Sequence, residues 1–164
     1  MNGKIKYCPM CRTLLKKKEV EEHLRLVCPK CGWVNYENPI PSVAILLKNP
    51  NNEILLIKRN VEPEKGKWAL PSGFIEAEET TEDATIRELK EETNLRGKIK
   101  RLLGVYIEHP KIYKSILVIG YEVEFISGSL LAGSDCSKAK FFPLEELPPI
   151  PFSAHRSIIN DGLK

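Results

Sequence analysis

Apolar runs with the length of β-strands recur along the chain from residue 42 onward. Residues 42–47 form a nearly uninterrupted apolar run, and residues 53–58 follow it after the turn 49–52. A short apolar run bounded by turn residues is typical of a buried strand, so we expect these two segments to form a hairpin. Three further strands are expected at 98–108, 114–125 and 138–143.

A helix is predicted between Thr80 and Asn94. Thr80, with Asp83 three residues later, has the pattern of a capping box, and Asn94 is typical of a left-handed C-terminal cap. At about 100° per residue, Ile86 and Leu89 fall on one side of this helix. That apolar side can anchor the helix on a core.

A second helix is predicted near the end of the chain, over residues 154–163, with Ser153 as its cap. Strands, one central helix and one closing helix favour an α/β protein in which a mixed sheet has helices on its faces.

The side of the first helix that faces away from the core has three carboxylates, Glu88, Glu91 and Glu92. Like charges one turn apart weaken a helix, and a divalent cation among them would relieve the repulsion. Oxygen ligands of this kind suit Mg²⁺ or Mn²⁺. Arg87 can pair with Glu91 one turn later, or reach back to Glu79. A solvated acidic face is the alternative, and the spacing favours the metal site.

The spacing of these residues resembles the Nudix box of the Nudix hydrolases. The matching positions are Gly73, Glu79, Arg87, Glu88, Leu89, Glu91, Glu92, Asn94 and Leu95. Asn94 stands where the family has a second glycine, and it keeps the capping chemistry. Chance matches to such a long, gapped pattern of charged and small residues are rare.

The resemblance implies a Nudix-type α/β/α sandwich with a mixed sheet and a pyrophosphohydrolase that depends on Mg²⁺ or Mn²⁺. It implies metal ligands at Glu88, Glu91 and Glu92, joined by Glu79 or by the Gly73 carbonyl. Arg87 is then expected to orient the site through an ion pair with Glu79, and Glu88 is the family's alternative general base. Some relatives use a carboxylate beyond the box instead. The candidates here, among which the sequence does not choose, are Glu122, Glu124, Asp135 and Glu145.

Four of the five cysteines form two Cys-x-x-Cys pairs, Cys8 with Cys11 and Cys28 with Cys31. Two such pairs at this separation indicate a Zn²⁺ site, and four thiolates leave no open position for water, which is typical of a structural ion. The segment resembles a zinc ribbon. A redox thiol pair is the rival interpretation, although redox motifs of this type are usually single. We therefore predict a zinc ribbon over 1–37 and a Nudix hydrolase domain over 38–164.

The net charge of +3 is unevenly distributed, because residues 1–31 contain eight Lys or Arg against three Glu. Such a basic module could attract phosphates or nucleic acid, although solubility alone explains an imbalance of this size. No apolar run long enough to span a membrane occurs, and the first residues lack the apolar stretch of a signal peptide, so a cytoplasmic protein is expected. By analogy with the family, a homodimer is also expected.

The resemblance implies a substrate in which a nucleoside diphosphate is linked to another group, such as ADP-ribose, FAD or NADH. Nucleoside triphosphates and the cap-like 5′ end of RNA are the alternatives, the latter with the basic ribbon holding the RNA. The marker sequence of the NADH enzymes downstream of the box is absent from residues 101–110. This absence favours ADP-ribose or dinucleotides in general over NADH. A non-catalytic binding module is a third hypothesis, and the intact acidic cluster counts against it.

Overall fold

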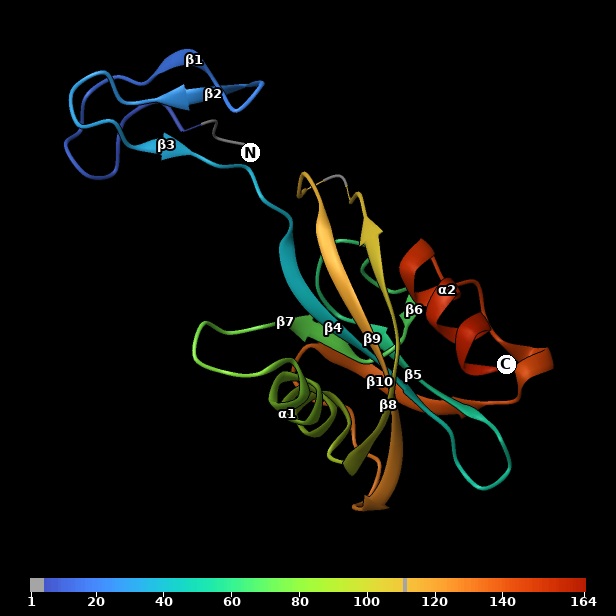
Figure 1. The fold of residues 1–164 in the computed structure, drawn as a ribbon. Coiled ribbons are helices and arrows are strands. Elements are labelled where there is room, and N and C mark those ends of the chain that lie inside the picture. Colours follow the sequence, from blue (N-terminus) through green and yellow to red (C-terminus); the bar gives the residue numbers. More distant parts are fainter. Residues whose placement is uncertain (1–4, 111) are drawn as a thin grey trace. The chain divides into compact units, whose positions relative to one another are not determined.

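The chain divides into two compact units, Met1–Asn38 and Pro39–Lys164, which we call the ribbon unit and the larger unit. The structure is a computed structural model that describes residues 5–110 and 112–164. The first four residues, which belong to the stretch used above to argue against a signal peptide, lie outside the described part. Figure 1 shows the two units, each of which is described by itself.

The ribbon unit is built on a small antiparallel sheet of three strands, β1 (Lys16–Val20), β2 (His23–Val27) and β3 (Val34–Asn35). Its core is a cluster formed by Cys8, Leu15 and Cys28, with Leu26 and Trp33 packed against it. So small a core stabilises a fold only weakly, which is why units of this size depend on a metal or on disulfides.

The larger unit contains two sheets. One has the order β7 (Ser72–Phe74), β4 (Ile40–Leu47), β9 (Ile116–Ser127) and β8 (Arg96–Glu108); the other has the order β10 (Cys136–Phe142), β5 (Ile54–Arg59) and β6 (Trp68–Ala69). Strand β4 is parallel to β9, and the other pairs are antiparallel. The expected mixed sheet is therefore confirmed.

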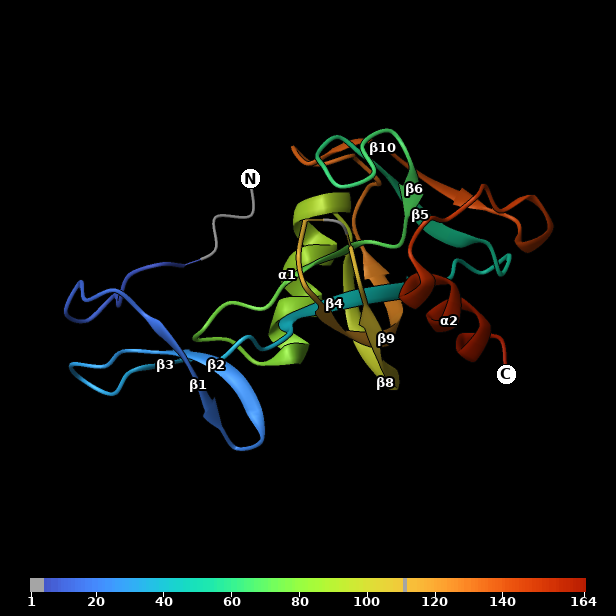
Figure 2. The same ribbon diagram turned by 90° about the horizontal axis from the view of Figure 1, so that it is seen from above.

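Helices cover both faces of these strands, with α1 (Thr81–Thr93) on one side and α2 (Ser153–Gly162) on the other (Figures 1 and 2). Strand β4 explains this layering. Its Val43 and Ile45 pack in the cluster that includes Leu89 of α1, whereas Ala44 and Leu46 pack in the cluster that includes Ile158 of α2. The sequence of a strand that is buried on both faces is typically a continuous apolar run, as in residues 42–47. The α/β/α sandwich is confirmed.

The expected hairpin of residues 42–47 with 53–58 is wrong. Strands β4 and β5 belong to different sheets and are linked only by an isolated bridge between Lys48 and Ile54. Strand β4 pairs instead with β9, about seventy residues away along the chain. Two apolar runs joined by a turn are compatible with both arrangements, because the run itself does not specify its partner.

The caps of helix α1 agree with the sequence. The Thr80 side chain accepts a hydrogen bond from the Asp83 amide, and Asn94 has the left-handed conformation with φ of 59°. Helix α2 differs, because Ser153 is its first helical residue and does not cap it. The Ser153 hydroxyl and the Ala154 amide instead both donate to the Glu108 carboxylate at the end of β8. A residue of β8 thus caps the start of helix α2, although the two elements are far apart in the sequence.

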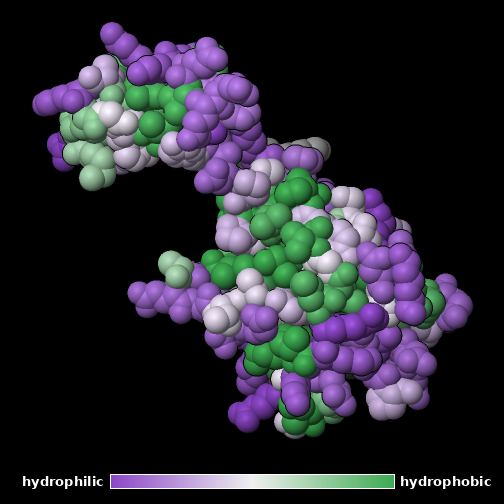
Figure 3. Space-filling view, in the orientation of Figure 1, coloured by the Kyte–Doolittle hydropathy of each residue, from purple (hydrophilic) through white to green (hydrophobic). Residues whose placement is uncertain are grey.

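Hydrophobic side chains remain on the surface of the larger unit, among hydrophilic residues (Figure 3). Three of them, Leu102, Val105 and Ile107, are about half exposed on strand β8. Strand β8 lies at the edge of its sheet. No helix in the described part of the chain combines the length and hydrophobicity that a membrane span requires.

Candidate active site

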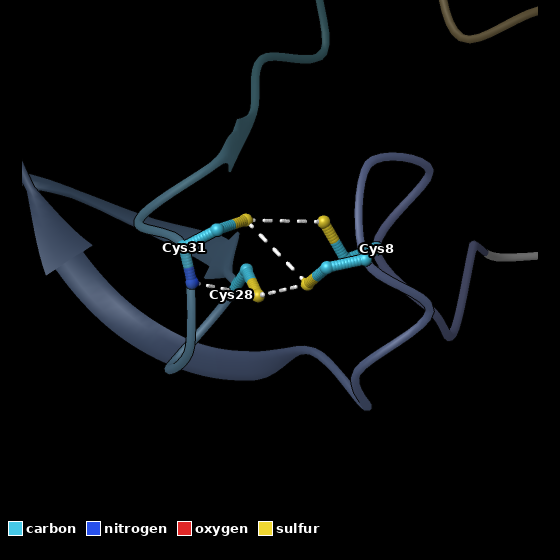
Figure 4. Close-up of side chains that lie close together, drawn as sticks. Cys8, Cys28 and Cys31 are labelled. Carbon is cyan, nitrogen blue, oxygen red and sulfur yellow. Dashed lines mark hydrogen bonds between the residues drawn. The ribbon is translucent and has the colours of Figure 1, made fainter.

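The four cysteines of the two Cys-x-x-Cys pairs come together in the ribbon unit. Their sulfur atoms all lie within 4.8 Å of one another, and the closest contacts are 3.4 Å between Cys11 and Cys28 and 3.5 Å between Cys8 and Cys31. Figure 4 shows the side chains of Cys8, Cys28 and Cys31 close together. Four sulfurs at about 2.3 Å from a tetrahedral ion would be about 3.8 Å apart. The donor set and its spacing therefore fit a Zn²⁺ ion.

In the larger unit, three of the predicted acidic residues line a cavity of about 440 Å³. Helix α1 presents Glu88, Glu91 and Glu92 to this cavity, and strand β7 presents Gly73 beside them. The three carboxylates differ in environment. The Glu91 side chain is 59% exposed, that of Glu88 is 13% exposed, and Glu92 is buried.

Arg87 is the cation nearest to this cluster, and its guanidinium contacts three carboxylates. It donates to both oxygens of Glu79, at 3.0 and 2.6 Å, and its Nη1 donates to Glu88 Oε1 at 2.6 Å and Glu91 Oε2 at 3.1 Å. Both alternatives considered for Arg87 are therefore present together. These contacts offset part of the repulsion among the carboxylates without a bound ion.

Glu79 is placed differently from the other acids of the box. It does not line the cavity; its two oxygens bind Arg87, and Oε1 also accepts a hydrogen bond from the Glu76 amide at 2.8 Å. The Arg87 guanidinium lowers the pKa of Glu79 to about 2, and Glu79 in turn raises the pKa of Arg87. Glu79 therefore holds Arg87 and the loop before α1.

Glu92 is the most deeply buried acid of the cluster. Its Oε2 accepts a hydrogen bond from the Ser72 amide at 2.8 Å, and the Cys136 thiol approaches Oε1 at 3.6 Å. Burial raises the pKa of Glu92 to about 8 despite the Ser72 hydrogen bond, and burial also raises the pKa of Glu88. A buried carboxylate is costly unless a positive charge accompanies it, and a cation bound here would lower both values.

Gly73 allows the Glu88 carboxylate to approach the backbone closely. A Cβ atom at this position would lie 1.9 Å from Glu88 Oε1 and 2.0 Å from its Cδ. The atoms it meets belong to the end of a flexible side chain, so the backbone need not move. The absence of a side chain at Gly73 thus leaves room for the Glu88 carboxylate beside the backbone.

Gly73→Ala is expected to leave the fold intact while displacing the Glu88 carboxylate from its position beside β7. We expect the melting temperature to stay within a few degrees and the hydrolytic rate to fall at least about tenfold, because a misplaced group at a reacting centre is costly. Thermal unfolding and initial rates on the same preparation would check this. Unchanged rates with an unchanged melting temperature would show that the position of Glu88 does not matter.

The rest of the cavity combines aromatic and charged residues that come from outside the box. Phe74 and Tyr113 make an edge-to-face contact with ring centroids 5.5 Å apart, and the Arg59 guanidinium lies 5.4 Å from the centre of the Phe152 ring. All four line the cavity. Arg59 was not predicted as a site residue from the sequence. Its position at the end of an apolar strand could have identified it as a candidate.

Of the four acids considered beyond the box, the structure places Asp135 in the cavity wall. Glu122 is buried elsewhere and forms ion pairs with Lys48, Lys100 and Arg101. Although its burial opposes ionisation, the hydrogen bonds from Lys100 and Arg101 lower the pKa of Glu122 to about 2. The remaining two, Glu124 and Glu145, are exposed and do not line the cavity.

His155 of α2 closes another side of the cavity and is buried. Its Nδ1 accepts a hydrogen bond from the Leu70 amide at 3.2 Å, which requires the neutral ring. Burial, together with the nearby Arg59, lowers the pKa of His155 to about 3. This histidine is a hydrogen-bonded structural residue.

His155 should make the larger unit less stable in acid. Its pKa is depressed on folding, so the unfolded chain binds the additional proton and stability falls as the pH drops below about 6.5, by about 1.4 kcal/mol per pH unit. His155→Asn keeps an acceptor for Leu70 and cannot titrate. Urea unfolding would give the free energy of unfolding between pH 7 and pH 5. Its dependence on pH should be weaker in the variant, by a difference that approaches one bound proton as the pH falls. An equal pH dependence in the two proteins would contradict this.

Comparison with known proteins identifies the family of this chain. The family model of the NUDIX domain matches residues 38–161, and that of the Nudix N-terminal zinc ribbon matches residues 6–37. The chain belongs to the Nudix hydrolases. The resemblance noted from residues 73–95 is thereby confirmed, and it extends to the ribbon unit.

Two curated relatives and one solved structure illustrate the relationship of this Nudix hydrolase to others. An ADP-ribose pyrophosphatase of Methanocaldococcus jannaschii is 38% identical over 93% of this chain and 84% of its own length. An NAD-capped RNA hydrolase NudC of Pseudomonas aeruginosa is 30% identical over 93% of this chain. The chain spans only 52% of that NudC protein. A Nudix hydrolase structure from Nitrosomonas europaea covers 94% of this chain, which spans 88% of it, with 29% identity and a TM-score of 0.81.

Proposed function

We propose that this Nudix hydrolase cleaves the pyrophosphate bond of a nucleoside diphosphate linked to a second group, with ADP-ribose as the first candidate, in a reaction that requires Mg²⁺ or Mn²⁺. The supporting observation is the cavity of about 440 Å³ that is lined both by Glu88, Glu91 and Glu92 and by aromatic side chains. Carboxylates can hold the ion that a diphosphate needs, and apolar rings suit a nucleoside.

Glu88, Glu91, Glu92 and the Gly73 carbonyl are the ligand set we propose for the divalent ion. All are hard oxygen donors, and Gly73 has no side chain to keep the ion or Glu88 away from the backbone. A bound ion would polarise phosphoryl oxygens and lower the pKa of a bound water. Glu79, first expected among the ligands, is better suited to holding Arg87, because both its oxygens are engaged there.

Two carboxylates are candidates for the general base. Glu88 lies beside Gly73 and Arg87, and burial raises its pKa toward the range in which a base is effective. Asp135 lines the cavity, and its backbone carbonyl accepts a hydrogen bond from the Asn60 amide. Among the four acids considered beyond the box, Asp135 has the geometric support.

ADP-ribose is favoured because the Methanocaldococcus jannaschii relative bears the name ADP-ribose pyrophosphatase. The aromatic walls suit an adenine ring, since Phe74, Tyr113 and Phe152 all border the cavity. The Arg59 guanidinium is a second cation in the cavity lining beside Arg87, and it could pair with a phosphate. Other dinucleotides such as FAD and NADH share the same chemical bond.

RNA with a dinucleotide at its 5′ end is the second candidate. The NudC relatives are named NAD-capped RNA hydrolases, and the ribbon unit is basic. The NADH marker is absent from residues 101–110, which weighs against the nicotinamide substrates. Nucleoside triphosphates remain a further alternative because they contain the same anhydride bond.

We also propose that Zn²⁺ occupies the four-cysteine site and that residues 1–37 and 38–164 are separate domains. The four sulfurs leave no position for substrate, so the ion's role would be structural. This Zn²⁺ would stabilise the small sheet of the ribbon unit.

A substrate panel tests the proposal most simply. ADP-ribose, FAD, NADH, ATP and an RNA with an NAD 5′ end would be incubated with Mg²⁺, with EDTA as the control. The products measured would be AMP, pyrophosphate and, for the RNA, nicotinamide mononucleotide. We expect AMP from ADP-ribose at the highest kcat/KM and none in EDTA. Turnover of ATP alone, with pyrophosphate as product, would contradict the substrate class.

A further inference from the structure

One face of the ribbon sheet combines positive charge with an exposed aromatic ring. Side chains alternate along a strand, so Lys16 and Lys18 of β1 share a face. The register places Lys18 directly opposite Arg25 of β2. Tyr36 follows β3, and its ring lies under the Arg25 guanidinium, 4.6 Å from the centre of the ring. We call these four residues the basic face.

The positive charges of the basic face have no acidic partner among the described residues. None of the ion pairs between described residues involves Lys16, Lys18 or Arg25, and Arg25 Nε has no hydrogen-bond partner. Like charges placed directly opposite each other on neighbouring strands destabilise a sheet. The pair of Lys18 and Arg25 is therefore a cost that an anionic ligand would remove.

The other face of the same sheet has a different character. Leu26 points to the cysteine core, and Leu15 precedes β1 in that core. Lys17 and Glu19 alternate with the lysines of the basic face and so belong to this second side. Within β1 and β2, the basic face thus has only positive charges, whereas the second side has one lysine and one glutamate.

Tyr36 distinguishes among anionic ligands. It is 49% exposed although the Arg25 guanidinium lies over its ring, so part of the side chain is open to solvent and accessible to a stacked base. Cations that follow a backbone together with an aromatic platform are the combination with which proteins bind single strands. A duplex keeps its bases stacked inside and offers none to such a ring.

We propose that the basic face, Lys16, Lys18, Arg25 and Tyr36, is a binding site for single-stranded nucleic acid. Phosphates bind the three cations and one base stacks on Tyr36. This site is on the ribbon unit, and its existence does not depend on what the cavity of the larger unit hydrolyses.

The test uses the full-length protein and fluorescein-labelled 20-nucleotide RNA and DNA of the same unstructured sequence, with fluorescence anisotropy read between 50 and 200 mM KCl. Lys16→Gln with Lys18→Gln should weaken binding at least about tenfold and lower the salt slope by about 1.4, since each phosphate contact on a single strand contributes about 0.7. Tyr36→Leu should weaken binding of the single strand about fivefold or more and leave that of a duplex unchanged. The tighter of RNA and DNA identifies the natural strand.

Lys17→Gln is the matched control, because it removes the same charge from the same strand on the other face. It should change the dissociation constant about twofold at most. Zinc content and the rate on free ADP-ribose should stay unchanged in all variants, which separates this site from the proposed activity. Lys18→Gln alone is the single-charge counterpart of Lys17→Gln on the basic face. No binding by the wild type, equal losses for Lys17→Gln and Lys18→Gln, or duplex bound as tightly as the single strand would overturn the proposal.

Discussion

Glu92→Gln is expected to lower the rate of pyrophosphate hydrolysis by about 10²- to 10⁴-fold without lowering the stability of the protein. Glutamine has the same shape and can still accept the hydrogen bond from the Ser72 amide. It cannot supply the negative charge that a divalent ion needs. Because burial raises the pKa of Glu92 to about 8, the charged form is costly in the folded protein, and a neutral residue should be tolerated.

The measurements are kcat with ADP-ribose over a range of Mg²⁺ concentrations, together with the melting temperature. Glu91→Gln should behave similarly and has less risk of disturbing the fold, because the Glu91 side chain is 59% exposed. Glu124→Gln is the charge-matched control on β9, since Glu124 is exposed and away from the cavity, and it should keep wild-type rates. Near wild-type turnover in both box variants would refute the proposed metal site.

Cys28→Ser is expected to abolish zinc binding and to unfold the ribbon unit. The hydroxyl of serine is a poor ligand for Zn²⁺ at neutral pH, and the Cys28 sulfur lies buried at the centre of the small core. Binding of a structural Zn²⁺ contributes about 10–16 kcal/mol in small zinc modules, far more than this core can supply. The unit should then lose its protection against amide hydrogen exchange.

Elemental analysis of zinc and hydrogen exchange over residues 5–38 would measure both effects. Cys136→Ser is the control, because Cys136 is a buried cysteine of the larger unit that is not part of the four-sulfur cluster. It should retain about one zinc per chain. Full zinc content in Cys28→Ser, or a protected ribbon without zinc, would contradict the assignment.

Features that depend on neighbouring residues could be predicted from the sequence. Helix α1 begins after Thr80 and ends at Asn94 as expected, because capping is decided within a few residues of each end. The four-cysteine cluster was predictable for a similar reason, since two short knuckles already supply the ligands in pairs.

Pairing between distant segments was not predictable. Residues 42–47 pair with β9 and not with β5, and nothing in their composition distinguishes the two partners. The same limit applies to the site. Glu91 and Glu92 are adjacent in sequence and were treated alike, yet only Glu92 is buried, because β7 and Cys136 pack against it. Arg59, which the sequence did not single out, reaches the cavity through tertiary packing as well.

The central claim is that the carboxylates of helix α1 hold a divalent ion in the cavity, and a crystal grown with Mn²⁺ tests it most directly. The account predicts an anomalous scattering peak about 2.0–2.5 Å from oxygens of Glu91, Glu92 and the Gly73 carbonyl, with Glu88 turned from Arg87 toward the ion. A fully occupied crystal with no peak in the cavity, and with Glu88 and Glu91 still bound to Arg87, would contradict it.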